Sequence, residues 1–361
     1  MPQSPLPKLR RRHALQLFAG ASGAFLLHAC QPKAEESPTA AGSSSSGGSD
    51  EGGGGSMSLS MGSAPWVGQV PLYIAQQQGF FEEEGLDFDL SLFGASGDYI
   101  SAFMGGNVDS VAPVSAEAVL MRSQGKDFKI VLIQDNSVGG DGILARNFIE
   151  SVEDFKGQKV AVDTTGVSYF FLLQVLKEAG LTKDDITVIN ADAPSAAAAF
   201  ESGNVDIAVS YAPYLQQTDR SIDDGRIIYD SSKMPTAIID LYLFDTAFIE
   251  ENPAAVQAFV NAIFKGTQFM DDNPDEMLEI GANELEVTPE ELASDLQGVK
   301  IPSVEDNLKM LAQPDSDIYI AQPLQELADF LLAEGLIESD PGDLSALLEP
   351  RFVQAYQEAQ A

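Results

Sequence analysis

Residues 103–111 read FMGGNVDSV and residues 200–208 read FESGNVDIA, and this weak repeat is the most informative pattern in the sequence. Each stretch follows a segment with apolar residues at helical spacing and opens into an apolar run that is typical of a strand. Gly85 and Gly180 precede the two units and mark equivalent turns. We interpret the pair as an internal repeat, which predicts two similar α/β lobes with equivalent turns facing each other.

Outside the repeat, short strand-like runs alternate with helix-like runs. In residues 86–92, Leu and Phe alternate with Asp and Ser at period two, which predicts a strand with one buried face. Further strands are predicted near residues 128–134, 159–163, 186–190, 205–210, 226–230 and 238–244. This order predicts an α/β protein with mostly parallel sheets. Ligands of such sheets bind beyond the carboxyl ends of the strands, for example at residues 63–71 and 113–117.

Acidic residues dominate the composition. The chain has 55 Asp and Glu against 20 Lys and Arg, a formal net charge of -35. All the acidic residues lie after Cys30, whereas four basic residues precede it. A nucleic-acid-binding protein needs the opposite sign, so we expect no nucleic-acid partner. The charge favours a solubility role over the steering of cationic ligands, and both interpretations stay open.

The positions of histidine and cysteine restrict the chemistry. His13, His28 and the only cysteine, Cys30, all fall within the first thirty residues. The rest of the chain therefore cannot hold a Ser-His triad, a cysteine nucleophile or a His/Cys metal site. Carboxylate and lysine chemistry stays open. We expect a binding protein without a cofactor or a metal rather than an enzyme.

Residues 1–29 have the layout of an export signal: a basic run at residues 8–12, an apolar stretch at 14–27 and a small residue before Cys30. The arginine run resembles a twin-arginine signal, and the sequence LHAC resembles a lipobox, although its histidine is unusual there. The resemblance implies lipidation of Cys30 and a membrane-anchored lipoprotein. The alternative is a basic helix that is kept on the protein. Residues 30–56, with SSSSGG and EGGGGS, predict a disordered tether.

Six segments after residue 56 carry a resemblance to a known family. They read PLYIAQQQGFFEEEGLDFDL, SAFMGGNVDSV, DNSVGGDGILAR, FKGQKVAVDTTGVSYFFL, AAAAFESGNVDIAVSYAPYL and IIDLYLFDTAFIEENP. In this order they resemble the NitT/TauT-like solute-binding proteins of nitrate, sulfonate, taurine and thiamine-precursor ABC importers. The resemblance implies a two-lobed periplasmic-binding-protein type II fold with two crossover segments. Lobe one is expected at 57–138 plus 236–350 and lobe two at 139–235, with a C-terminal helix end at 351–361.

The same resemblance implies a periplasmic receptor that captures a small organic solute between its lobes and delivers it to an ABC permease and ATPase. A monomer is expected. The candidate ligands are sulfonate- or taurine-like, nitrate-like or aminopyrimidine-like. Because carboxylates outnumber cations in the candidate loops, a neutral or amine-bearing solute fits better than a simple anion. The alternatives are a sensing or partner-binding protein on the same fold and a relative of pyrimidine-synthesis enzymes.

The resemblance places the ligand against residues of the expected loops. They are Trp66, Ser96, Gly97, Asp98, Ser137, Asp141, Thr164, Thr165, Gly166, Val167, Ser168 and Tyr211. Ser96 and Thr165 stand at expected helix starts, where a hydroxyl caps the helix, contacts the ligand, or does both. Trp66 fits a core position as well as a pocket wall, and Asp141 fits a structural loop carboxylate. Glycines at 139, 140 and 142 suit a segment that changes its backbone angles when the lobes close.

Overall fold

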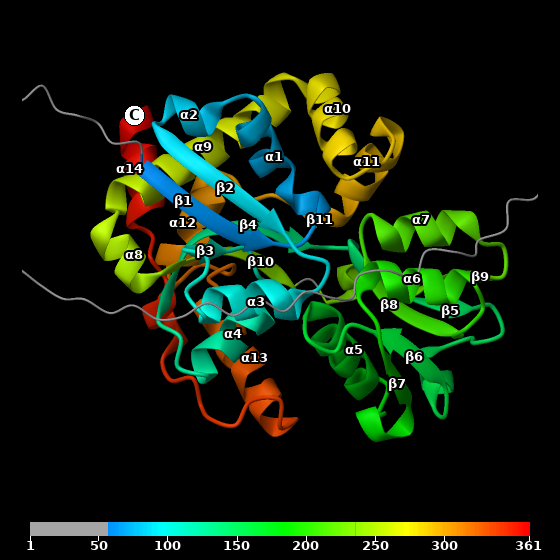
Figure 1. Cartoon of the computed structure of the whole chain (residues 1–361). Helices are drawn as coiled ribbons and strands as arrows, with labels where there is room; N and C mark the ends of the chain where they lie inside the picture. Colours follow the sequence, from blue (N-terminus) through cyan, green and yellow to red (C-terminus); the bar gives the residue numbers. More distant parts are fainter. Residues whose placement is uncertain (1–56, 235) are drawn as a thin grey trace, which may run out of the picture. The chain divides into compact units, whose positions relative to one another are not determined.

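The strands of this chain form two separate sheets, shown in the computed structural model of Figure 1. The structure describes residues 57–234 and 236–361, so the predicted signal peptide, Cys30 and the tether lie outside the described residues. The six-stranded sheet has the order β11-β4-β10-β3-β1-β2. Its strands are β1 (Met57–Ser63), β2 (Leu86–Leu92), β3 (Ser110–Val111), β4 (Phe128–Ser137), β10 (Ile239–Asp245) and β11 (Val299–Lys300).

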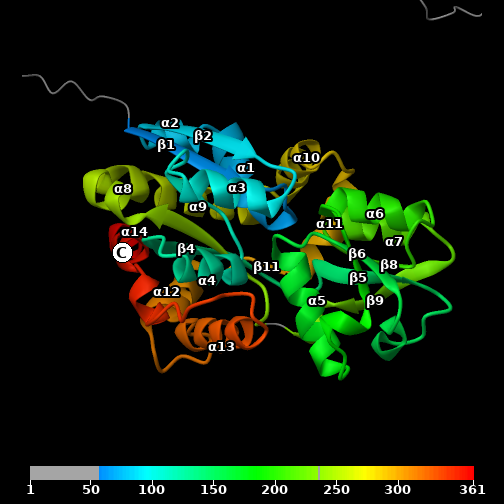
Figure 2. The same ribbon diagram turned by 60° about the horizontal axis from the view of Figure 1, so that its bottom comes forward.

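The five-stranded sheet has the order β7-β6-β8-β5-β9. Its strands are β5 (Asp141–Arg146), β6 (Lys159–Val162), β7 (Thr187–Asn190), β8 (Ile207–Tyr211) and β9 (Gly225–Asp230). Three helices accompany it: α5 (Val167–Glu178), α6 (Ala193–Glu201) and α7 (Tyr214–Ser221). We call this part of the chain the second lobe; Figure 2 shows its helices gathered around the sheet.

The first lobe is the part of the chain around the six-stranded sheet. Its helices are α1 (Val70–Gln77), α2 (Phe80–Glu83), α3 (Ser96–Met104), α4 (Ser115–Ser123), α8 (Thr246–Glu251), α9 (Pro253–Asp272), α10 (Pro274–Glu284), α11 (Pro289–Asp295), α12 (Val304–Ala312), α13 (Ala321–Ala333) and α14 (Arg351–Gln360). All the described residues belong to one compact unit, so the exact boundaries between the lobes stay predictions. No helix of the described residues has the length and apolarity that a bilayer span needs.

Both sheets are mixed, and the direction of each strand follows from where the chain crosses. Strand β1 pairs in parallel with β2 and β3, and β6 pairs in parallel with β7 and β8. Strands β5 and β10 pair antiparallel with all their neighbours. They begin at the edge where the parallel strands end, because the chain enters each sheet there from the other one. The predicted α/β fold is confirmed, with a smaller parallel share than the sequence indicated.

The two copies of the GNVD pattern fold alike. Each lies between a helix and a strand, α3 and β3 in the first lobe and α6 and β8 in the second. Gly106 has a φ of 71° and Gly203 a φ of 74°, the left-handed region that favours glycine. The next residues, Asn107 and Asn204, donate their backbone N–H to the carbonyl five residues earlier, at 2.8 and 2.9 Å. The repeat is therefore a repeated helix-ending turn.

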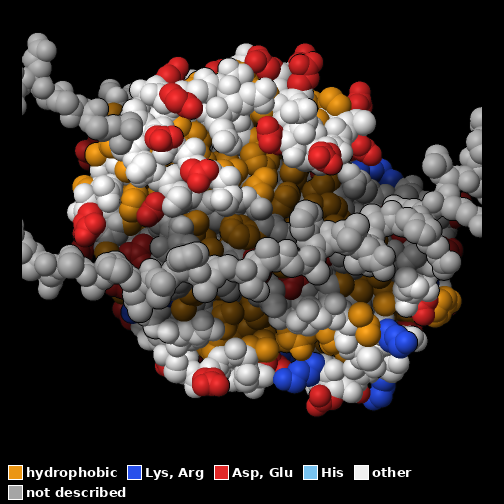
Figure 3. Space-filling model, viewed as in Figure 1, with side chains coloured by type: hydrophobic (Ala, Val, Ile, Leu, Met, Phe, Trp, Pro, Cys, Tyr) orange, Lys and Arg blue, Asp and Glu red, His pale blue; other side chains and the backbone are white. Residues whose placement is uncertain are grey.

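Acidic side chains are spread over the surface rather than gathered in one patch on the face that Figure 3 shows. Asp87 and Asp89 of β2 and Glu82 of α2 are examples of such exposed carboxylates. Their dispersal over separate elements is what a solvated, soluble surface needs. It agrees with the interpretation of the net charge as a solubility feature.

The repeated turn leads to a matched pair of substitutions. We expect Gly106→Ala and Gly203→Ala each to lower the free energy of unfolding by about 1–2 kcal/mol, because a Cβ disfavours the left-handed conformation. An added Cβ at Gly106 meets nothing within 4 Å, so the loss there comes from the backbone alone. Urea unfolding measures the effect. Gly106→Asn is the control and should lose less, and equal losses for Ala and Asn would contradict this account.

Candidate functional site

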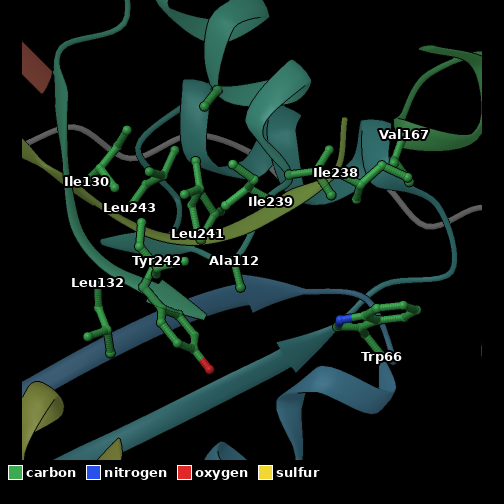
Figure 4. Packing of buried hydrophobic residues seen from close by; sticks show 14 of the residues in the cluster. Trp66, Ala112, Ile130, Leu132, Val167, Ile238, Ile239, Leu241, Tyr242 and Leu243 are labelled. Atoms are coloured by element: carbon green, nitrogen blue, oxygen red, sulfur yellow. The ribbon is translucent and has the colours of Figure 1, made fainter. Parts of the chain in front are cut away.

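A cavity of about 40 Å³ lies where the parallel strands of both sheets end. The first lobe lines it with Ser63, Ala64, Pro65, Trp66, Gln69, Ser96, Tyr99, Ala112, Val114, Ile238 and Asp240, and the second lobe with Asp141, Val167 and Tyr211. In Figure 4, Trp66, Ala112 and Ile238 come from the first lobe and Val167 from the second. The space suits a few water-sized groups. A molecule that fills it contacts both lobes.

Trp66 forms part of the wall and also packs across the lobes. Its indole N–H donates to Asp135 Oδ2 at 2.9 Å, and its ring meets the Tyr211 ring edge-on at a centroid distance of 5.9 Å. Gly68 makes this arrangement possible, because a Cβ at that position would overlap both the indole and the Asp135 carboxylate. Both interpretations of Trp66 from the sequence, lobe packing and pocket wall, therefore describe the same side chain.

Buried carboxyl groups surround the cavity. Asp141 is 3% exposed and Asp240 is 8% exposed, and both line it. Asp135 and Glu117 are fully buried. Burial raises the pKa of Asp135, Asp141 and Glu117 to about 7, because a charged carboxylate is poorly solvated there. Burial and the neighbouring Asp135 also raise the pKa of Asp240 well above its ordinary value.

Several side-chain hydrogen-bond donors near the cavity already donate to acceptors within the protein. The Tyr99 hydroxyl donates to Glu117 Oε2, and the Gln69 amide donates to Ser63 Oγ. By contrast, Asp240 Oδ2 and Glu117 Oε1 have no hydrogen-bond partner among the described residues. No described residue that lines the cavity carries a basic side chain. The side chains at this site thus offer unused acceptors and few free donors.

A contact between the two lobes lies beside the cavity. The Gly97 N–H donates to Thr165 Oγ1 at 3.2 Å, and that hydroxyl donates to Asp163 Oδ1 at 2.6 Å. Gly166 lies so close to the first lobe that an added Cβ would be 2.8 Å from Glu117 Oε1 and would overlap Ser96. The second lobe therefore approaches the start of α3 with its backbone.

The capping interpretation of Ser96 and Thr165 is wrong. Ala95 is the N-cap of α3 and Gly166 the N-cap of α5, and neither helix has a side-chain cap. Ser96 is the first residue inside α3, and its hydroxyl bonds to Glu117. Thr165 bonds to Asp163 and Gly97 instead. The Ser96 hydroxyl is therefore used within the first lobe, and the Thr165 hydroxyl joins the two lobes.

The structure brings part of the predicted site together. Trp66, Ser96, Asp141, Val167 and Tyr211 line the cavity. Gly97, Thr164 and Thr165 border a separate, open hollow. The other four residues border neither space. Asp98 is exposed and Ser168 is buried. The Ser137 hydroxyl lies 2.8 Å from the Ser231 hydroxyl, and Gly166 lies close to the Ser96 side chain. Ligand contact stays a prediction for all twelve residues.

Several lining residues were not singled out from the sequence. Ser63 and Val114 lie in the strand-end loops 63–71 and 113–117, so the position of these loops was the available signal. Tyr99 lies inside α3 and reads as an ordinary apolar helix position. Asp240 is the second residue of β10, a strand that begins at the cavity. The rule that ligands bind beyond the carboxyl ends of strands does not predict a residue at the start of a strand.

Comparison with known proteins identifies the family. The profile of the family described as NMT1/THI5 like matches residues 66–277, more than half of the chain. The chain belongs to the NMT1/THI5-like family. The resemblance inferred from the six sequence segments is therefore confirmed.

Individual members and neighbours extend this result. The NMT1/THI5-like chain is 24% identical to the taurine-binding periplasmic protein of Escherichia coli K12 over 299 residues, covering 79% of this chain and 89% of the relative. The alkanesulfonate-binding protein SsuA from Xanthomonas axonopodis pv. citri, bound to MOPS, aligns with a TM-score of 0.66 at 18% identity, covering 81% of this chain and 98% of that one. The desulfurization enzyme DSZB aligns with a TM-score of 0.61 at 16% identity, covering 84% and 100%. These structures confirm the periplasmic-binding-protein fold.

The buried Asp141 leads to a prediction about pH. Its pKa is about 7 in the folded protein against an ordinary value of 3.8, so the folded protein holds the proton more tightly than the unfolded chain does. Its contribution to the free energy of unfolding is therefore fully present below about pH 4 and is lost as the pH rises to about 7. We expect Asp141→Asn to be more stable than the wild type by on the order of 1–3 kcal/mol at pH 8 and equally stable near pH 4.

Urea unfolding at both pH values measures this difference. Asp87→Asn is the matched control, because Asp87 is exposed on β2 and its replacement removes the same charge. We expect this control to leave the pH dependence of unfolding unchanged. A gain for Asp141→Asn that is the same at pH 4 and pH 8 would contradict the buried-carboxyl account.

Proposed function

We propose that this protein is the extracytoplasmic solute-binding component of an ABC importer. One observation carries the proposal: the cavity is lined by both lobes, with Trp66 and Asp240 on one side and Asp141 and Tyr211 on the other. A solute bound there holds the lobes together, and a permease can then distinguish the loaded receptor from the empty one. The relatives, a taurine-binding periplasmic protein among them, support this role.

Capture depends on movement of the lobes about their crossover segments. One segment leads from β4 into β5 and the other from β9 into β10. Gly139 has a φ of 134°, which favours glycine, and an added Cβ at Gly140 would be 2.5 Å from the Trp66 ring. A segment of this kind allows the change in backbone angles that hinge closure needs. The contact between Gly97 and Thr165 then belongs to the closed arrangement.

Binding fits the composition better than catalysis. Histidine and cysteine occur only in the first thirty residues, so the cavity has neither a thiol nor an imidazole. An enzyme here would rely on carboxyl groups and on serine and tyrosine hydroxyls for nucleophilic and acid-base chemistry. The desulfurization enzyme shares the fold, and a shared fold leaves the chemistry to the site. We therefore favour the receptor over an enzyme.

Gly166 supplies the test of closure. Its φ of -143° and ψ of -159° are open to any residue, so Gly166→Ala acts on the approach to Ser96 and Glu117 rather than on the local backbone. We expect the variant to bind solute at least about tenfold more weakly, because a 1.4 kcal/mol clash in the closed form is a factor of ten. Its unliganded unfolding should match the wild type.

Calorimetry with ethanolamine, taurine and acetamidine measures this affinity, and small-angle scattering with and without solute measures compaction. Gly94→Ala is the control, because the nearest atom to its added Cβ is 3.9 Å away. Wild-type affinity together with wild-type compaction in Gly166→Ala would rule out closure by this contact.

We also propose that the protein is exported, by the twin-arginine route, and anchored through a lipid on Cys30. The support is the basic run, the LHAC sequence and the Gly/Ser-rich stretch that follows. One acyl chain alone binds membranes weakly, so a stable anchor requires the multiple acylation typical of such a cysteine.

Cell fractionation tests the anchor. We expect the wild-type protein in the membrane fraction and Cys30→Ser in the soluble extracytoplasmic fraction, because the serine cannot carry the thioether lipid. Ser44→Ala, in the same polar stretch, should fractionate as the wild type does. Mass spectrometry of the mature N-terminus that found an unmodified residue other than Cys30 would remove the lipid from this account.

A further inference from the structure

The cavity has a hydrogen-bonding imbalance that points to the chemistry of its ligand. Asp240 lines it, is 8% exposed, and has one carboxyl oxygen, Oδ2, that no donor of the described residues reaches, although its carboxyl group also hydrogen-bonds to that of Asp135 when one of the two is protonated. Asp141 lines the same space from the second lobe. A buried acceptor that finds no donor costs stability, so a ligand that brings N–H donors gains binding energy here.

A simple anion does not satisfy these groups. The side-chain donors of Trp66, Tyr99 and Gln69 already serve Asp135, Glu117 and Ser63. An anion beside the carboxyl groups of Asp141 and Asp240 would be repelled wherever they are ionised. The N-terminal ends of α3 and α5 reach the cavity through Ser96 and Val167, and their dipoles favour negative charge. An anionic group therefore has a place only at that end of the space.

Resting on the proposed receptor function, we propose that the captured solute carries a protonated amine or amidine whose N–H groups bridge Asp141 of the second lobe and Asp240 of the first. One cationic group then joins the two lobes. Trp66, Tyr99 and Tyr211 form apolar parts of the wall. Such a wall suits the carbon skeleton of an organic cation, whereas a hydrated metal ion seeks oxygen ligands on every side.

Capture of such a cation is coupled to proton release. Burial raises the pKa of Asp141 to about 7 and that of Asp240 well above its ordinary value, so the folded protein holds protons on this pair more tightly than the unfolded chain does. A bound cation favours their ionised forms and displaces the protons. The titratable groups that face this pair from neighbouring elements are Tyr99 and Glu117 on α3 and α4, Asp135 on β4, Tyr211 on β8 and Tyr242 on β10.

Matched solutes test the ligand class. Ethanolamine, taurine and isethionate share a two-carbon skeleton and differ in carrying a cation, both charges or an anion; acetamidine and acetate form a second pair. We expect calorimetry to show binding of the ammonium- or amidinium-bearing members at least about tenfold tighter than that of their anionic partners. Ethanolamine against taurine shows whether the ends of α3 and α5 hold an anionic group as well.

The wild type also reports on the carboxyl pair without any substitution. Between pH 5 and pH 7, the affinity for the cationic solute should rise, by up to about tenfold per pH unit for each proton released. Titrations in two buffers of different ionisation enthalpy count these protons. A pH-independent affinity with no proton release would overturn the proposed bridge even if an amine binds.

Variants assign the effect to the two residues. Asp240→Asn and Asp141→Asn should each weaken binding of the cationic solute at least about tenfold and reduce proton release. Asp87→Asn, remote on β2, should bind as the wild type does. Tight binding of isethionate or acetate that neither cavity variant affects would overturn this inference and leave the receptor function standing. Failure of every solute to bind would overturn both.

Discussion

The hydroxyl of Ser231 ties the two chain crossings together, and the arrangement of the site depends on this contact. Its Oγ lies 2.8 Å from Ser137 Oγ and accepts the backbone N–H of Gly139 at 2.7 Å. The N–H of Asp141 approaches the same oxygen at 3.4 Å. One fully buried serine thus joins the end of β4, the start of β5 and the segment before β10. The Ser231 hydroxyl therefore holds the starts of β5 and β10 near each other.

The Ser231 contacts explain why residues from distant parts of the sequence line one small cavity. Asp141 starts β5 and Asp240 lies at the start of β10, so both carboxyl groups sit next to a crossing. The other walls come from the ends of β1, β3 and β8. In the sheets, β3 lies between β1 and β10, and β8 lies next to β5. Close backbone approach completes the enclosure, at Gly68 beneath the indole and at Gly166 against α3. Glycine is required at these two places for lack of room rather than for backbone angle.

The helices and strands could be predicted from the sequence better than the contacts between them. Period-two runs and the GNVD repeat record which face of a strand is buried and where a helix ends, and these are local properties. The strands near residues 128–134, 159–163 and 205–210 follow from them. Tyr99 and Asp240 escaped prediction because their role depends on a surface from another lobe. Ser96 and Thr165 look like caps because each adjoins the start of a helix, and their contacts with Glu117 and Gly97 come from segments that lie elsewhere in the sequence.

The position of Trp66 makes the protein a reporter of its own occupancy. It is the only tryptophan in 361 residues, it borders the cavity, and its ring packs on Tyr211 of the other lobe. Indole emission excited selectively above the tyrosine band therefore arises from this one ring. A change in the polarity or in the neighbours of the ring shifts that emission without an added dye. The protein carries an intrinsic optical probe at the place where its two lobes meet.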